Sequence, residues 1–306
     1  MEPYRQSTIK NNLVLRSKII QSIRDFFNGQ GYLEVETPIR IPSPAPEIHI
    51  DAEPSGPWYL HTSPELCMKR LLASGYPRVY QICKCFRRKE RGNRHLPEFT
   101  LLEWYTANDD YMGMMNQTEA LIKHITESIS SEETITYQGE HIALQSPWLK
   151  LTVSEAFKKY ASMSLSEAVV QGKFDEIMAL EIEPKLPRNI PVFLHDYPSE
   201  MAALARLKPE DRSVAERFEL YIGGLELCNA FTELTDPKEQ RDRFKEAAHQ
   251  RKQSDKLVYP MPERFLSALQ DMPDATGNAL GIDRLVMLFA DAATIDEVVA
   301  FSPEEL

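Results

Sequence analysis

A basic loop between two apolar runs is the feature of this sequence best suited to chemistry. The runs span 79–86 and 99–105, and the loop contains five cations and a histidine: Arg87, Arg88, Lys89, Arg91, Arg94 and His95. In a chain with a formal net charge of -11, such a cluster predicts a site for an anion. An exposed basic loop is the alternative, but the flanking runs also carry Glu103 and Tyr105, which suggests that the loop lies over a site.

A second group of polar residues, Glu226, Asn229 and Glu233, occurs in the otherwise apolar segment 215–233. A carboxylate in such a segment is costly to bury unless it is paired or bound to a cation. Two carboxylates and an amide suit Mg²⁺, which takes one or two carboxylates together with substrate phosphates. From the residues alone, two surface glutamates at a strand edge are an equally open interpretation.

A third candidate site lies in 272–288, where small residues and two glycines precede an apolar helix with Arg284 in its first turn. Backbone N–H groups at a helix start, together with an arginine, form an anion site. His195 and Asp196 are also adjacent, but neighbouring residues of a strand point to opposite faces. We therefore do not expect these two side chains to be coupled.

Periodicity predicts the elements that position these residues. Apolar positions three and four residues apart over 12–28 predict an amphipathic helix that is stopped by Gly29 and Gly31, and 33–36 alternates as a short strand. The runs 79–86 and 99–105 predict an antiparallel hairpin, and 215–233 predicts a strand pair that turns at Gly223-Gly224. Further strands are predicted at 58–61 and 191–194, with a short hairpin around 138–139. Helices are predicted after 63, after a cap at Asp109 or Asp110, after 152, in 161–190, over 237–253 and around 285–289.

Composition limits the class of protein. A chain of 306 residues can bury a substantial core, and no apolar run approaches the ~18 residues of a membrane span. The polar N-terminus does not resemble a signal peptide, and the four cysteines (Cys67, Cys83, Cys85 and Cys228) are expected to be reduced in a cytoplasmic protein. Cys83 and Cys85 would share one strand face as core packing. The acidic balance argues against a large nucleic-acid footprint.

Several segments resemble a known family. Phe86-Arg87, the run 95–100 and Glu103-Trp104-Tyr105 resemble motif 2 of class II aminoacyl-tRNA synthetases of the lysyl type. The helix, glycine, strand and proline of 12–38 resemble motif 1, and GNALGIDRLVML at 277–288 resembles motif 3. The segments TSPE at 62–65 and ELCNAFTEL at 226–234 are also similar to that family, and the resemblance covers 12–160 and 190–302.

Within the lysyl type, the chain resembles most a shortened family, the elongation factor P (R)-β-lysine ligases. Motif 1 begins almost at the N-terminus, where synthetases have an anticodon-binding domain, and Ala279 occupies a position that is typical of the ligases. The resemblance implies an α+β class II catalytic fold, an antiparallel sheet flanked by helices, in a single domain over 1–306. It also implies a cytoplasmic homodimer with no membrane contact.

The resemblance further implies the activity. ATP and Mg²⁺ would activate (R)-β-lysine as an adenylate, which is then transferred to a lysine of elongation factor P, with tRNA not expected as acceptor. Arg87 and Arg284 would be catalytic. The resemblance also implies residues that bind the amino acid: Ser63, Pro64, Glu65, Tyr105, Asn229, Glu233 and Ala279. Besides the two arginines, it implies residues that bind the nucleotide: Arg88, Lys89, Glu90, His95, Leu96, Phe99, Glu226, Leu227 and Gly281. The implied metal ligands are Glu226 and Glu233.

Three positions depart from the family pattern. Lys89 stands where an acid normally contacts adenine, so either Glu90 replaces it through a loop shift or the contact is lost. Leu96 replaces an asparagine and Ala230 replaces a glycine.

Two alternative functions stay open. One is a lysyl ligase that acts on tRNA, and the other is a non-catalytic module derived from the fold.

Overall fold

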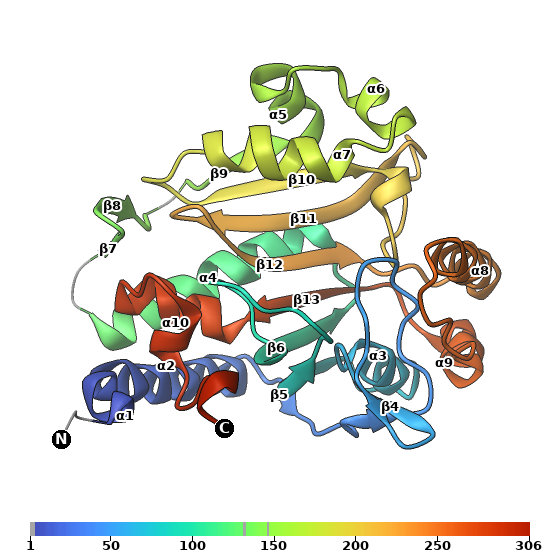
Figure 1. Ribbon diagram of the computed structural model, residues 1–306. Coiled ribbons are helices and arrows are strands. Elements are labelled where there is room, and N and C mark those ends of the chain that lie inside the picture. Colours follow the sequence, from blue (N-terminus) through green and yellow to red (C-terminus); the bar gives the residue numbers. More distant parts are fainter. Residues whose placement is uncertain (1–3, 131–132, 146) are drawn as a thin grey trace.

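One large sheet organises the protein, whose computed structural model describes residues 4–130, 133–145 and 147–306. Its eight strands lie side by side in an order that differs from the order of the sequence (Figure 1). Across the sheet, the strands are β1 (Leu33–Glu34), β5 (Arg78–Phe86), β6 (Glu98–Ala107), β13 (Ala275–Gly281), β12 (Leu225–Thr232), β11 (Val214–Ile222), β10 (Val192–Pro198) and β9 (Leu149–Thr152).

The sheet is antiparallel in its centre and parallel at both edges. From β5 to β10 every neighbouring pair is antiparallel, as predicted, but β1 pairs in parallel with β5 and β9 with β10. The prediction of an antiparallel sheet is therefore wrong at the edges. Parallel neighbours need long crossover connections, and the chain supplies them: β2 (Arg40–Ile41), β3 (Pro54–Ser55), β4 (Trp58–Leu60) and α3 (Glu65–Ala73) precede β5, and α5 (Val153–Tyr160), α6 (Leu165–Val170) and α7 (Phe174–Ile177) precede β10.

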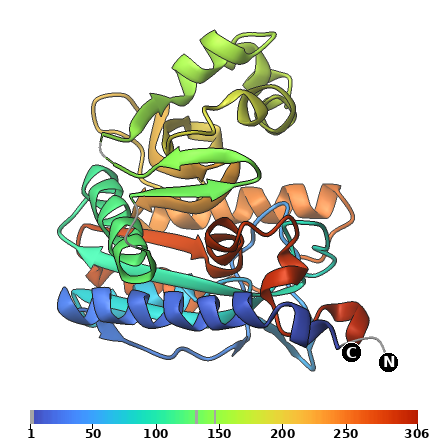
Figure 2. The same cartoon turned by 90° about the vertical axis from the view of Figure 1, so that its left-hand side faces the viewer.

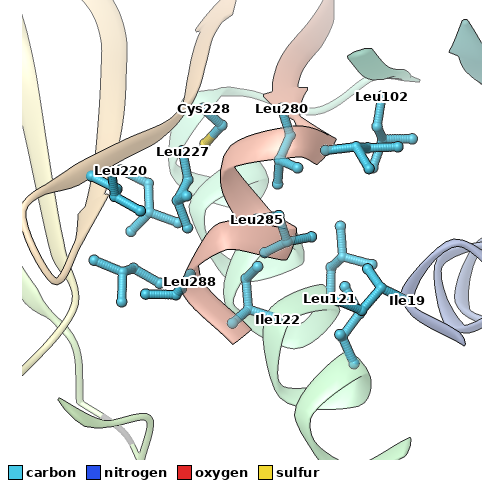
Figure 3. Close-up of a cluster of buried hydrophobic side chains, with 14 of the residues drawn as sticks. Ile19, Leu102, Leu121, Ile122, Leu220, Leu227, Cys228, Leu280, Leu285 and Leu288 are labelled. Atoms are coloured by element: carbon cyan, nitrogen blue, oxygen red, sulfur yellow. The ribbon is translucent and has the colours of Figure 1, made fainter. Parts of the chain in front are cut away.

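Three helices cover one face of the sheet. They are α2 (Lys10–Gly29), α4 (Tyr111–Ile129) and α10 (Ile282–Ala290), with α1 (Arg5–Thr8) before α2 (Figures 1 and 2). Figure 3 shows Leu285 and Leu288 of α10 among side chains from α2, α4 and the strands. Burial of each such leucine contributes roughly 2 kcal/mol. The apolar face of α10 is thus fixed in the core.

The local signals read from the sequence are confirmed at several element ends. Asp110 accepts hydrogen bonds from the N–H groups of Met112 and Gly113 at the start of α4, and Thr152 and Glu155 form a capping box at α5. The strands β7 (Thr134–Tyr137) and β8 (Glu140–Ala143) form the predicted hairpin. The remaining α-helices are α8 (Pro237–Gln253) and α9 (Glu263–Ala268), and none of the described helices is long and apolar enough to cross a membrane.

The prediction that His195 and Asp196 are uncoupled is wrong. Asp196 has a φ of 63°, and the register of β10 against β11 shifts between His195 and Tyr197. This bulge removes the strict alternation of side chains, so that Nδ1 of His195 lies 3.2 Å from Oδ1 of Asp196. Asp196 also accepts a hydrogen bond from Tyr111 and pairs with Lys208, 2.8 and 2.7 Å away.

Candidate active site

The face of the sheet opposite α2, α4 and α10 carries the polar residues. Residues that are directly opposite in an antiparallel sheet share a face, and the register places Asn229, Ala279 and Glu103 in one row across β12, β13 and β6. The next row contains Phe231, Gly277 and Tyr105. Alternation along β6 therefore directs Trp104 into the core and its neighbours Glu103 and Tyr105 to the other face.

A bulge in β12 brings Glu226 to this face. Tyr221 of β11 pairs with Glu226 and Leu220 pairs with Cys228, so Leu227 is an extra residue with no partner on β11. In a regular strand, Glu226 and Asn229 are three residues apart and would point to opposite faces. The extra residue changes this parity and places both side chains in one cavity.

The cavity on this face has a volume of about 640 Å³, within the usual range for small-molecule sites. It gathers fifteen of the residues expected from the sequence: Ser63, Glu65, Arg87, Lys89, Glu90, His95, Leu96, Phe99, Tyr105, Glu226, Leu227, Asn229, Ala279, Gly281 and Arg284. Leu96 and Leu227 border it with side chains that are mostly in the core. Three expected residues lie outside its lining: Pro64, Arg88 and Glu233. Arg88 instead faces Glu53, 3.8 Å away.

Arg284 lies between the basic loop and β12. Its Nη1 donates to the backbone oxygen of Glu226 at 2.9 Å and lies 3.1 Å from the Glu226 carboxylate, and its Nη2 donates to Nε2 of His95 at 2.5 Å. Burial and the nearby Arg284 guanidinium lower the pKa of His95, which favours the neutral imidazole as hydrogen-bond acceptor. Arg284 thus links the two anion-binding segments that the sequence predicts separately.

Arg87 enters the same cavity from the basic loop. Its guanidinium lies over the ring of Phe99, 4.9 Å from the ring centre, and 3.9 Å from Glu90. Its Nε is buried and has no hydrogen-bond partner among the described residues. Buried donors are nearly always satisfied, so this atom is available to a bound anion.

The loop after Arg87 turns sharply at Lys89. The N–H of Glu90 donates to the carbonyl oxygen of Arg87 at 3.3 Å, and Lys89 has a φ of 65°, a left-handed conformation that is uncommon outside glycine. The turn places both Lys89 and Glu90 at the cavity. An acidic side chain is therefore present at this end of the cavity, although one position later than in the family pattern.

The other end of the cavity is acidic and closely hydrogen-bonded. Ser63 donates to one carboxyl oxygen of Glu103 at 2.6 Å, and Tyr105 donates to the other at 2.8 Å. Burial, reinforced by the nearby Glu65, raises the pKa of Glu103 well above its ordinary value. Ser63 also accepts from the N–H of Glu65 at 3.0 Å, which fixes the start of α3.

Lys69 is a residue that the sequence analysis missed. It is only 1% exposed, and its Nζ lies 2.5 Å from a carboxylate oxygen of Glu65 and 2.5 Å from one of Glu233. Burial alone would lower the pKa of Lys69, but the two carboxylates outweigh it and raise this pKa. Glu65 and Lys69 are four residues apart on a predicted helix, and oppositely charged side chains at this spacing can pair. This spacing is the feature of the sequence that could have revealed Lys69.

Arg217 and Glu219 were also missed, although they alternate along β11 towards the cavity. Arg217 pairs with Glu219 at 2.6 Å and donates to the side-chain oxygen of Asn229 at 3.1 Å. Tyr197 and Tyr221 donate to Glu219 at 2.5 and 2.7 Å. A buried charged network of this kind holds its side chains in fixed positions.

The structure does not bring Glu226 and Glu233 together. Seven residues along an extended strand correspond to roughly 20 Å, and the Glu233 carboxylate faces Lys69 rather than the cavity. The second carboxylate near Glu226 is Glu219, which lines the same cavity. The charge of Glu226 helps to raise the pKa of Glu219, after the larger effect of burial.

An antiparallel core that presents two arginines, one from a basic hairpin loop and one from a following helix, defines a class II synthetase catalytic domain. The chain belongs to this family: the family model for class II tRNA synthetases (D, K and N) matches residues 2–305. The chain is 40% identical over 310 residues to the elongation factor P--(R)-beta-lysine ligase of Haemophilus influenzae (strain PittGG), covering 95% of this chain and 94% of the relative.

Two further relatives have a similar identity to this chain. The elongation factor P--(R)-beta-lysine ligase of Edwardsiella ictaluri is 38% identical over 320 residues, with 99% of this chain and 98% of the relative covered. A lysine--tRNA ligase of Pelotomaculum thermopropionicum is 39% identical over 326 residues, with 96% of this chain but 63% of the relative covered.

Proposed function

We propose that this protein uses ATP to activate (R)-β-lysine as an adenylate and transfers it to a lysine side chain of elongation factor P. The names of the relatives, and the near-complete coverage of those named for this reaction, support the proposal. The observation that carries it is the meeting of Arg87 and Arg284 in one cavity that also has a carboxylate-rich end. A triphosphate and an amino acid need these two kinds of surface side by side.

Arg87 would bind the α-phosphate and the carboxylate of the amino acid, and Arg284 the terminal phosphate. The amino-acid carboxylate attacks the α-phosphorus, and pyrophosphate leaves from the opposite side. Negative charge grows on the phosphoryl oxygens and on the leaving group during this step, so cations fixed beforehand lower its barrier. The unsatisfied Nε of Arg87 fits this role. Binding of ATP would exchange the Arg284–Glu226 and Arg284–His95 contacts for contacts to phosphate oxygens.

Adenine would lie at the basic loop, near Phe99 and the turn at Lys89. Glu90 is the acidic side chain at this place, and it lines the cavity as the loop-shift hypothesis requires. Its carboxylate would accept a hydrogen bond from the exocyclic amino group of adenine. Lys89, next to it, would face solvent or an outer phosphate.

Glu226 is the metal ligand that we propose, with Glu219 as the nearest second carboxylate in place of Glu233. Oxygen donors of this type, beside a phosphate site, fit Mg²⁺. When bound there, Mg²⁺ would supply positive charge beside the phosphates. Arg217 and the two tyrosines that hold Glu219 would keep its position constant whether or not the ion is present.

The acidic end would bind the two amino groups of a lysine-like substrate. Glu65, Tyr105 and Asn229 line the cavity there. The Glu65 carboxylate would bind the ammonium group at the far end of the substrate side chain. Ala279 and Gly277 also line the cavity. Glu233 would act indirectly, because its carboxylate contacts Lys69, which in turn holds Glu65.

A ligase that acts on tRNA is the second candidate, favoured by the 39% identity to a lysine--tRNA ligase. The two candidate functions differ in the molecule that accepts the activated amino acid. Purified protein should be incubated with ATP and labelled (R)-β-lysine, with elongation factor P or lysine tRNA as acceptor. Label on elongation factor P, and none on tRNA, supports the proposal, whereas label on tRNA alone contradicts it. The variant of elongation factor P that lacks the acceptor lysine is the matched control.

We further propose a homodimer formed through α2 and β1. In the described structure, β1 is an edge strand, and Val14 of α2 and Leu33 of β1 are each 49% exposed. Exposed apolar residues beside an open strand edge are typical of an interface. Sedimentation of the wild type and of Leu33→Asp tests this: a dimer that becomes monomeric supports it, and a monomeric wild type contradicts it.

A further inference from the structure

Two cysteines and a histidine form a cluster beside the cavity. Cys83 and Cys85 lie on one face of β5, with their sulfur atoms 3.9 Å apart, and Nε2 of His61 lies 3.9 Å from the Cys85 sulfur. All three potential ligand atoms lie within 4.8 Å of one another. We infer that His61, Cys83 and Cys85 bind a soft divalent metal ion of the zinc type.

The distances match those that a zinc ion imposes. With Zn–S bonds of about 2.3 Å and Zn–N bonds of about 2.0 Å, the edges of a tetrahedral site are about 3.8 Å between sulfurs and about 3.5 Å between sulfur and nitrogen. The cluster therefore needs shifts of only a few tenths of an ångström along the two edges measured. Two thiolates also cancel the charge of the ion, which keeps the cost of a buried site low.

The backbone holds the cluster together without a metal. The N–H of Phe86 donates to the carbonyl oxygen of His61 at 3.0 Å, and the N–H of His61 donates to that of Ile39 at 2.8 Å. The histidine is thus fixed beside the strand that carries both cysteines. Cys83 is partly exposed whereas Cys85 and His61 are buried, so an ion can enter from the Cys83 side and keep a water molecule as its fourth ligand.

In the described structure, His61 is hydrogen-bonded through only one of its two ring nitrogens. Its Nδ1 is buried and has no partner in the described part of the chain, and its Nε2 lies 2.7 Å from the carbonyl oxygen of Lys84. Without a metal, Nε2 carries the proton and donates it to that oxygen. Coordination through Nε2 would replace this bond, with the ring proton moved to Nδ1, while the two thiol protons are released to solvent.

A disulfide is the competing use of the two thiols. Its sulfurs must approach to about 2.05 Å, and residues two apart on a strand have Cα atoms about 6.6 Å apart, near the upper limit of disulfide geometry. At the observed sulfur separation of 3.9 Å the two cysteines are not bonded to each other, and this separation is close to the sulfur–sulfur edge of a zinc site. Both cysteines are free in the structure.

The test uses full-length protein that has been reduced and stripped of metal. Addition of Co²⁺ should produce thiolate-to-metal charge-transfer absorption at one equivalent, and Zn²⁺ should abolish it by displacement. Zn²⁺ should also raise the midpoint of thermal unfolding, because a ligand that binds only the folded state stabilises it. Cys83→Ser should lose both effects.

Cys67→Ser is the matched control, because Cys67 is also a partly buried free thiol but lies outside the cluster. It should behave as the wild type. No charge-transfer band in the wild type, or a band that persists in Cys83→Ser, overturns the inference. A wild-type protein that forms the Cys83–Cys85 disulfide in the presence of Zn²⁺ overturns it as well. These measurements use the wild type and Cys83→Ser, and Cys83 is partly exposed. The test therefore needs no substitution of the buried Cys85, which could prevent folding.

Discussion

The ammonium group of Lys69 lies 2.5 Å from a carboxylate oxygen of Glu233, and both side chains are buried. Glu65 holds the same ammonium from the cavity side, also at 2.5 Å. The rings of Phe231 and Phe265 lie 5.0 and 5.9 Å from it. Lys69 therefore connects Glu233, which lies outside the cavity lining, to Glu65, which lines the cavity. Its positive charge balances one of the two carboxylates.

Lys69→Met should destabilise the protein by about 3–5 kcal/mol, because it leaves the buried Glu233 carboxylate and the partly buried Glu65 carboxylate without their cation. Denaturant unfolding measures this loss. Arg70→Met is the control, since Arg70 is the exposed neighbour on the same helix, and it should change stability by less than about 0.5 kcal/mol. Equal stability of the two variants would contradict the role of Lys69.

Arg87→Ala should reduce kcat/KM for ATP-dependent activation by about 10²–10³-fold, the usual effect of removing one fixed charge-stabilising group. Arg88→Ala is a demanding control because the two arginines are adjacent, whereas Arg88 points to Glu53 outside the cavity. It should retain wild-type activity. A larger loss of kcat/KM in Arg88→Ala than in Arg87→Ala would show that Arg88, and not Arg87, is the arginine of this loop that acts on the substrates.

Gly277→Ala should impair amino-acid binding more than ATP binding. A Cβ at this position would lie 2.4 Å from an oxygen of Glu233 and 2.4 Å from the ring of Tyr105. Both side chains are buried, so the overpacking should cost about 1–3 kcal/mol. Steady-state KM values for both substrates and an unfolding curve test this. Gly29→Ala, with no atom within 4 Å, should leave both KM values unchanged.

Glu47 predicts a pH dependence of stability. Burial, opposed by the charge of Arg87, raises the pKa of Glu47 from 4.5 to about 7. Between these values the folded protein holds a proton that the unfolded chain has released. The contribution of Glu47 to stability is therefore complete below pH 4.5 and is lost as the pH rises through about 7.

Unfolding curves of the wild type and of Glu47→Gln across this pH range measure the effect. The wild type should lose stability relative to Glu47→Gln as the pH rises. Glu53→Gln, which changes a carboxylate that is half exposed, controls for the loss of one negative charge. A constant difference between wild type and Glu47→Gln at every pH would contradict the raised pKa.

The sequence predicts the elements of the site better than the orientation of its side chains. The hairpin, the strand pair at Gly223-Gly224 and the helix after Gly281 follow from local patterns, and Arg87 and Arg284 meet as the family resemblance implies. The bulges at Leu227 and Asp196 were not predicted, because an extra residue leaves no trace in a pattern of period two.

Tertiary contacts account for the remaining differences. Lys69 falls in the helix that is predicted after 63, and nothing local shows that α3 packs this position against Glu233 and two aromatic rings. For the same reason Glu233 was predicted as a metal ligand on the strength of its spacing from Glu226. The parallel edges of the sheet also depend on which strands pair, which single-strand patterns do not determine.

Amino-acid-dependent exchange of labelled pyrophosphate into ATP tests the central claim most directly, because it detects adenylate formation without an acceptor. We predict exchange with (R)-β-lysine that exceeds exchange with α-lysine and is abolished in Arg284→Ala. Exchange with neither isomer would indicate a non-catalytic protein. Exchange with α-lysine alone, accompanied by charging of tRNA, would contradict the proposed substrate and acceptor.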